Sequence, residues 1–214
     1  MQRSQNQPIA LKKPFFYDIT LRDGNQSLKK PWSIEEKLFI FDKIVSLGIP
    51  AVEIGFPASS DMDFKSCQLL ASRANDKTLV SVLARANKND IDKALLAIKN
   101  SKNARLHTFI TLSPFHVKHV LNKTLNEAKT LAVEAVKYAH SEIIKNNIKA
   151  DIEFSVEHFG DCIENLDFVI ETLKEVTKAG ATTINLPNTV ERRRPMIFVD
   201  MVKKVKEALA DNIT

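Results

Sequence analysis

The sequence predicts an α/β fold built on a parallel sheet, and two observations carry this prediction. Strand-like and helix-like segments alternate strictly along the chain, in six units. The strand-like segments are short, mostly apolar runs, as expected for strands that are covered on both faces. This pattern is typical of either a doubly wound sheet or a (β/α)₈ barrel. No GxGxxG motif follows any strand, which counts against a dinucleotide-binding sheet.

The first unit shows the signals on which the element boundaries depend. Residues 15–21 combine apolar and polar positions in the alternation of a strand. Ser33 and Glu36 have the spacing of a capping box, which predicts a helix that ends at Gly48. The same reasoning, with Ser60 or Asp61 and Asn89 or Asp90 as helix caps, places the later elements. We expect strands over residues 51–56, 78–84, 105–112, 151–156 and 182–186, and helices over residues 61–74, 90–98, 125–145, 165–179 and 195–210.

Composition favours an ordinary globular protein that binds neither nucleic acid nor membrane. Of the 214 residues, 44% are hydrophobic and 27% charged, and the net charge of +5 comes from scattered lysines. No apolar run approaches the roughly 20 residues of a membrane span. The polar segment 1–10 lacks a secretory signal, so we expect a cytoplasmic protein. Cys67 and Cys162 form no CxxC motif and are expected to be buried free thiols.

Polar side chains stand at or near the carboxyl ends of the expected strands, where a barrel gathers its active site. Each one has a plain structural alternative. Glu53 can neutralise a buried arginine such as Arg22, and His107 can be a satisfied core histidine. Glu157 can be an exposed loop acid. Together, however, they describe a pocket for a small anion and a metal ion: Arg22, Asp23, Glu53, Arg85, His107, Thr111, Ser155, Glu157, His158, Asn185, Asn188 and Thr189.

Three stretches that contain some of these polar residues resemble the 2-isopropylmalate synthase family. They are residues 21–26 (LRDGNQ), 53–57 (EIGFP) and 184–191 (INLPNTVE), and the resemblance extends over about residues 14–210. That family belongs to the metal-dependent Claisen-type acyltransferases and lyases, which are built on a TIM barrel. Homocitrate synthase, citramalate synthase and hydroxymethylglutaryl-CoA lyase are its relatives. The resemblance therefore implies the barrel rather than the doubly wound sheet.

The resemblance also implies roles for individual residues. Asp23 corresponds to the metal-binding aspartate, for Mg²⁺, Mn²⁺ or Zn²⁺. Arg22 corresponds to the arginine that steadies the 2-oxo acid and the developing oxyanion, and Glu53 to the buried glutamate that holds it. With Glu157 these two form the implied catalytic set. His107, Ser155 and Thr189 correspond to positions that line the 2-oxo acid pocket. The implied reaction is the condensation of acetyl-CoA with 2-oxoisovalerate in leucine biosynthesis.

One departure from the family pattern changes what we expect of this chain. The family completes its metal site with a His-x-His from the seventh strand, and no His-x-His occurs in this sequence. We therefore expect residues 14–214 to form a partial TIM barrel of six units behind a flexible lead, residues 1–13. We expect no activity from this chain alone, and association into a dimer through open sheet edges. The alternatives are an inactive interaction module or a related homocitrate or citramalate synthase.

Overall fold

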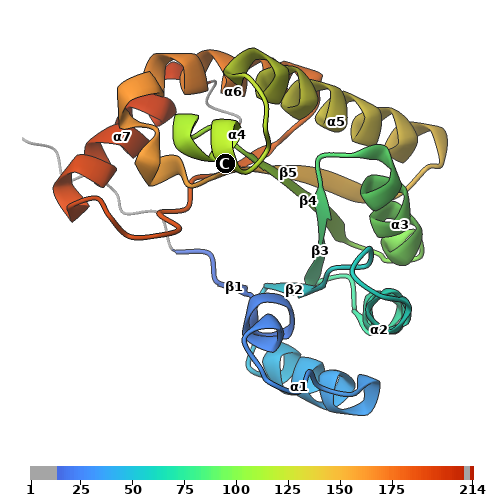
Figure 1. The fold of residues 1–214 in the computed structure, drawn as a ribbon. Coiled ribbons are helices and arrows are strands. Elements are labelled where there is room, and N and C mark those ends of the chain that lie inside the picture. Colours follow the sequence, from blue (N-terminus) through green and yellow to red (C-terminus); the bar gives the residue numbers. More distant parts are fainter. Residues whose placement is uncertain (1–13, 210–212) are drawn as a thin grey trace, which may run out of the picture.

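A computed structural model describes residues 14–209 and 213–214 of the chain. The expected lead, residues 1–13, and the end of the last expected helix at residue 210 lie outside the described residues. The strands form one sheet in the order β1-β2-β3-β4-β5-β6, and every neighbouring pair is parallel. The sheet curls into a half-barrel with the helices on its outer side (Figure 1). The prediction of sequential parallel strands in a TIM-barrel type of fold is confirmed.

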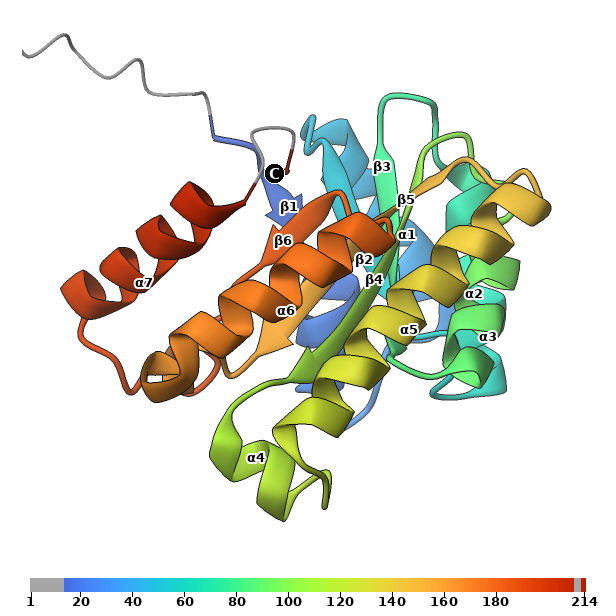
Figure 2. The ribbon, with the colours of Figure 1, turned by 90° about the horizontal axis from the view of Figure 1, so that it is seen from above.

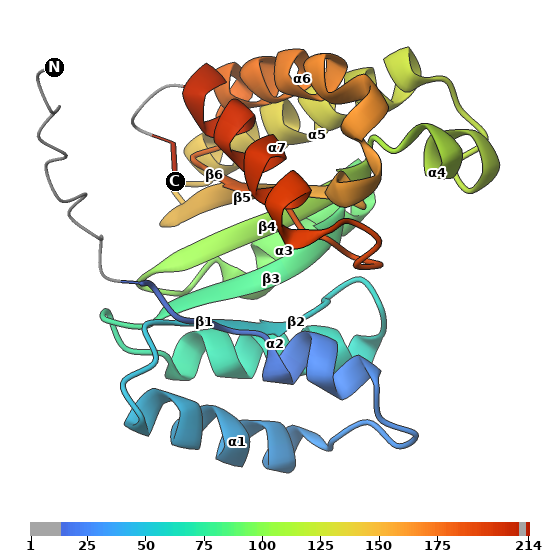
Figure 3. The ribbon, with the colours of Figure 1, turned by 90° about the vertical axis from the view of Figure 1, so that its left-hand side faces the viewer.

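The strands and helices follow the expected segments closely. The strands are β1 (Tyr17–Asp18), β2 (Ala51–Gly55), β3 (Leu79–Arg85), β4 (Ala104–Thr111), β5 (Ala150–Glu157) and β6 (Thr183–Asn185). The helices are α1 (Ile34–Ser46), α2 (Asp61–Arg73), α3 (Lys88–Ile98), α4 (Pro114–His119), α5 (Leu125–Lys145), α6 (Leu166–Ala179) and α7 (Pro195–Ala208). Helices α5 and α6 lie side by side along the sheet (Figure 2), and α1 and α2 cover the other end (Figure 3).

Two expectations about boundaries are wrong. The first strand is only two residues long, because the Asp18 carboxylate accepts a hydrogen bond from the Thr20 backbone N–H at 2.9 Å and turns the chain out of the sheet. The residues that follow, Thr20–Gly24, form a π-helical turn, whereas a strand was expected to residue 21. Helix α3 is capped by the Asn87 side chain, which accepts from the Asp90 N–H, and by neither Asn89 nor Asp90.

The expectation of open sheet edges needs one correction. Thr214 exchanges backbone hydrogen bonds with β6, since its N–H donates to Thr182 and its carbonyl accepts from Ile184, at 3.1 and 2.9 Å. The outer edge of β6 is thus partly paired, as though by the start of a further strand. Such pairing reduces the number of free backbone groups that could recruit a second copy of the chain.

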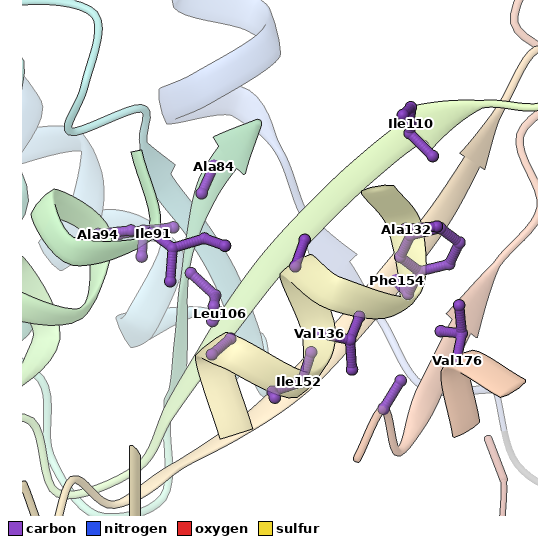
Figure 4. Packing of buried hydrophobic residues seen from close by; sticks show 14 of the residues in the cluster. Ala84, Ile91, Ala94, Leu106, Ile110, Ala132, Val136, Ile152, Phe154 and Val176 are labelled. Atoms are coloured by element: carbon purple, nitrogen blue, oxygen red, sulfur yellow. The ribbon is translucent and has the colours of Figure 1, made fainter. Parts of the chain in front are cut away.

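The apolar core lies between the outer face of the sheet and the helices. Leu106, Ile152 and Phe154 project outward from β4 and β5 and are buried against residues such as Ile91 of α3 and Val136 of α5 (Figure 4). The positions between them face the inside of the curl. The cross-strand register pairs His107 with Glu153 there, and it continues with other polar pairs along β4 and β5. The sheet therefore has an apolar outer face and a polar inner face.

Candidate functional site

Glu53 lies at the centre of a buried hydrogen-bond network on the inner face of the sheet. Its side chain is fully buried, and its two oxygens bind different partners. One accepts from the Arg22 Nε at 2.5 Å and the other lies 2.6 Å from the His107 Nδ1. The second ring nitrogen of His107 lies 2.7 Å from the Ser155 hydroxyl. The predicted contact between Glu53 and Arg22 is confirmed, and the network extends it across β4 to β5.

A buried carboxylate at this position stays ionised because of its partners. Burial alone would raise the pKa of Glu53. The hydrogen bond from His107 and the charges of His107 and Arg22 outweigh burial, so the pKa of Glu53 lies below its ordinary value. An ionised carboxylate only accepts hydrogen bonds, so the His107 Nδ1 carries the proton in this contact. The Glu53 carboxylate therefore fixes the orientation of both the Arg22 guanidinium and the His107 ring.

Above this network lies a pocket of about 380 Å³ at the carboxyl ends of the strands. All of the residues to which the family resemblance gives a role line it, except Glu53, which lies beneath. Arg22 and Asp23 come from the π-helical turn, Ile19 directly precedes that turn, and the other lining residues come from β3 to β6 and the loop after β6. The pocket is lined by Ile19, Arg22, Asp23, Leu83, His107, Phe109, Ser155, Glu157, Asn185, Pro187 and Thr189. The expected clustering at one end of the sheet is confirmed.

The expectation that strand-end groups share one pocket fails for some residues. Arg85 ends β3 but turns away to bind Asp90 at the start of α3, with an Nε–Oδ2 distance of 2.6 Å. Thr111, His158 and Asn188 also do not line the pocket. Thr189 has a second function besides lining it, because its hydroxyl accepts a hydrogen bond from the His158 backbone N–H at 3.0 Å. This bond ties the loop after β5 to the loop after β6.

Sequence reasoning missed a second charged group on the inner face. Arg105 binds Asp151 with paired contacts of 2.7 Å and also reaches Glu153 at 3.3 Å. Glu153 in turn accepts from the Asn185 amide at 3.0 Å. The signal that could have revealed these residues is their spacing, since Glu153 stands two residues before Ser155 and Arg105 two residues before His107. Residues two apart on a strand share one face.

The donor set around Asp23 does not by itself fit a divalent cation. One of its oxygens accepts from the Arg22 Nη1 at 2.8 Å. In residues 14–209 and 213–214, no group of three His, Cys, Asp or Glu side chains with ligand spacing includes Asp23. Divalent cations need several protein ligands at once before they give up their waters. Asp23 thus offers one carboxylate oxygen to a site that the described residues do not complete.

In the same part of the chain, no helix is long and apolar enough to cross a membrane.

Comparison with known proteins finds a family model and curated relatives that match most of the chain. The model of the HMGL-like family matches residues 13–214. The 2-isopropylmalate synthase 2 of Leptospira interrogans is 40% identical over 205 residues, which are 96% of this chain and 47% of that protein. The 2-isopropylmalate synthase of Pyrococcus abyssi is 36% identical over 201 residues, 94% of this chain and 40% of that protein. The chain thus spans less than half the length of these relatives.

Two solved structures are similar in fold alone, because their sequence identities are low. The hydroxymethylglutaryl-CoA lyase of Pseudomonas aeruginosa has a TM-score of 0.70 at 16% identity, covering 90% of this chain and 63% of that one. The carboxyl transferase domain of pyruvate carboxylase from Rhizobium etli has a TM-score of 0.65 at 16% identity, covering 94% and 34%. Both comparisons agree with a half-barrel of TIM-barrel type.

Proposed function

The chain belongs to the HMGL-like family, and on that premise we propose that it supplies the 2-oxo acid pocket of a 2-isopropylmalate synthase-type acyltransferase. The reaction would be the condensation of acetyl-CoA with 2-oxoisovalerate. The single observation that carries the proposal is the network of Arg22, Glu53 and His107 directly beneath a pocket of suitable size. Enzymes of this family depend on a divalent metal ion and use acetyl-CoA.

Arg22 is the group that would hold the substrate. Its Nε is occupied by Glu53 and its Nη1 by Asp23, so the guanidinium is held rigidly with its other N–H groups available at the pocket. A guanidinium pairs well with a carboxylate, and it would also hold the alkoxide that forms when the ketone is attacked. Removing one such oxyanion donor costs about 10²–10³ in rate. Asp23 would contribute one carboxylate ligand to the metal.

The remaining polar residues would orient the 2-oxo acid. His107 and Ser155 form one hydrogen-bonded pair at the pocket floor, and because both ring nitrogens of His107 are engaged, the Ser155 hydroxyl is the group of this pair that could contact a bound oxygen atom. Glu157 supplies a carboxylate to the lining of the pocket. Thr189 also lines it and keeps the neighbouring loop in place.

The apolar part of the wall favours 2-oxoisovalerate over a dicarboxylic 2-oxo acid. Ile19, Leu83, Phe109 and Pro187 line the pocket. Among the described lining residues Arg22 is the one lysine or arginine, so a second substrate carboxylate would meet no further cation of that kind. This observation counts against the homocitrate synthase alternative. It is a weaker argument against the citramalate synthase alternative, because hydrophobic pockets discriminate between substrates by only about 1–3 kcal/mol per methylene.

Calorimetric titration of the purified chain with 2-oxo acids tests the proposal. We expect 2-oxoisovalerate to bind more tightly than both 2-oxoglutarate and 3-methylbutanoate, which lacks the ketone. Arg22→Gln should weaken binding at least about tenfold, since a charge-assisted hydrogen bond contributes about 1.5–3 kcal/mol. Arg85→Gln is the matched control. Arg85 also stands at the end of a strand and binds a carboxylate, but it lies outside the pocket. Equal affinities for all three acids, or equal losses in both variants, would favour the interaction-module alternative.

A further inference from the structure

Three metal-binding side chains gather beside the pocket and have no part in the proposed reaction. They are His116 in α4, His158 directly after β5, and Asp161 in the short 3₁₀ turn that follows. One ligand atom from each lies within 4.8 Å of the others. None of the three lines the pocket. We propose that they form a second metal site, for Zn²⁺ or a similar borderline transition metal, distinct from Asp23.

The residue types determine which metal the site would take. Imidazole nitrogen favours Zn²⁺, Ni²⁺ and Cu²⁺, whereas Mg²⁺ and Ca²⁺ favour oxygen alone. At a Zn–N distance of about 2.0–2.1 Å, ligand atoms in a tetrahedral site lie about 3.3 Å apart. The ligand atoms therefore need to approach by up to about 1.5 Å, which rotation about the side-chain bonds can supply. Two histidines and one aspartate leave the fourth position of a tetrahedral ion to water.

Each histidine has a ring nitrogen available for a metal ion, and one of the two stacked rings has to rotate before both in-plane lone pairs can meet on the same ion. The His116 Nδ1 lies 3.1 Å from the Ser113 hydroxyl, which leaves the other ring nitrogen available. A hydrogen bond to the second nitrogen is the usual support of a metal-binding histidine. The His116 and His158 rings stack with centroids 3.7 Å apart and planes inclined by 6°. The His158 Nδ1 is buried without a hydrogen-bond partner, so this ring has an unused ligand atom.

The backbone around His158 is held in an unusual conformation. Its φ of 59° lies in the left-handed region, which is uncommon for residues other than glycine, although asparagine, aspartate and histidine adopt it more often than the rest. The loop is fixed against the loop after β6 by the bond to Thr189 and by a second bond, from the Arg193 Nε to the Gly160 carbonyl at 2.7 Å. Such local strain persists where the surroundings hold it, and it gathers at functional sites.

Occupation of this site would connect two segments that follow neighbouring strands. His116 belongs to the segment after β4, and His158 and Asp161 to the segment after β5. Thr189, which lines the pocket, is bound to the His158 backbone. The metal would thus stiffen the pocket wall without contacting the substrate.

Titration with ZnCl₂ by calorimetry, and with CoCl₂ by visible absorption, tests the proposal on the purified chain. We expect one equivalent to bind, with Co²⁺ showing the ligand-field bands of a four- or five-coordinate ion. His116→Ala, His158→Asn and Asp161→Asn should each weaken binding at least about tenfold. Asparagine is chosen at 158 because it tolerates a positive φ. His119→Ala, in the same short helix but outside the cluster, should leave the affinity unchanged, and so should Asp23→Ala.

Several results would overturn the proposal. They are no binding of Zn²⁺ at millimolar concentration, binding that survives in all three cluster variants, and binding lost equally in His119→Ala or Asp23→Ala. Thermal unfolding followed by circular dichroism separates lost ligands from lost folding. Because the three substitutions fall in two separate segments, a variant that fails to fold leaves the others to decide.

Discussion

Replacing Glu53 by glutamine perturbs the centre of the site with almost no change in volume. The substitution removes the charge that both Arg22 and His107 contact, at 2.5 and 2.6 Å. The Glu53 side chain is fully buried and that of Arg22 is 16% exposed, so water screens the pair poorly. Breaking a buried ion pair by removing one partner costs about 3–5 kcal/mol. Since Asp23 remains as a partner of Arg22, we expect the lower half of that range for Glu53→Gln.

Urea unfolding followed by circular dichroism measures this loss. For a domain of this size, 3–4 kcal/mol corresponds to a fall in the urea midpoint of about 1–2 M. Asp42→Asn is the matched control, because Asp42 binds Arg73 through two contacts of 2.6 Å but both side chains are about half exposed. The control should leave the midpoint close to that of the unchanged chain. A similar shift in both variants would refute the reasoning, because burial would then not matter.

The other predictions concern pH, backbone and activity. The pKa of Glu53 is lowered in the folded chain, so its contribution to stability is complete above the ordinary glutamate pKa and is lost as the pH falls through the lowered value. The difference in unfolding free energy between the unchanged chain and Glu53→Gln should therefore shrink in acid, and a difference that grows there would contradict the assignment. Gly55→Ala should destabilise the chain by about 1–3 kcal/mol, since Gly55 has a φ of +154° and a Cβ would lie 2.7 Å from the Cys67 Sγ. In a urea double-mutant cycle, Cys67→Ala should recover part of this loss, and strict additivity would show that the contact is irrelevant. Finally, the 214-residue chain should release no detectable thiol from acetyl-CoA with 2-oxoisovalerate and Mg²⁺ or Mn²⁺, because the described residues place Asp23 in no group of three metal-binding side chains. Turnover that Asp23→Ala abolishes would overturn that expectation.

Much of the fold followed from local patterns. The capping box at Ser33 and Glu36 is present with both of its hydrogen bonds, and α5 has the expected limits. Such signals are local and do not depend on the rest of the chain. The predicted length of the first strand was wrong because a local side chain opposed the apolar pattern. Apolar alternation favoured a strand to residue 21, but the Asp18 side chain competes for the backbone and starts a turn.

A contact in the site could be predicted where a residue had one obvious partner. The contact between Arg22 and Glu53 could be predicted because a buried glutamate needs a cation. The role of His107 as a bridge between Glu53 and Ser155 depends on the register of β4 and β5, which no local pattern gives. The cluster of His116, His158 and Asp161 depends on how two loops meet, and only the structure brings these residues together.

The most direct test of the proposed 2-oxo acid pocket is a crystal structure of the chain with 2-oxoisovalerate. The proposal predicts the substrate carboxylate or ketone oxygen within hydrogen-bond distance of the Arg22 guanidinium, with the isopropyl group against Leu83 and Phe109. Glu53 should still contact both Arg22 and His107. A ligand bound elsewhere on the chain, or an Arg22 side chain released from Glu53 and directed into solvent, would contradict it.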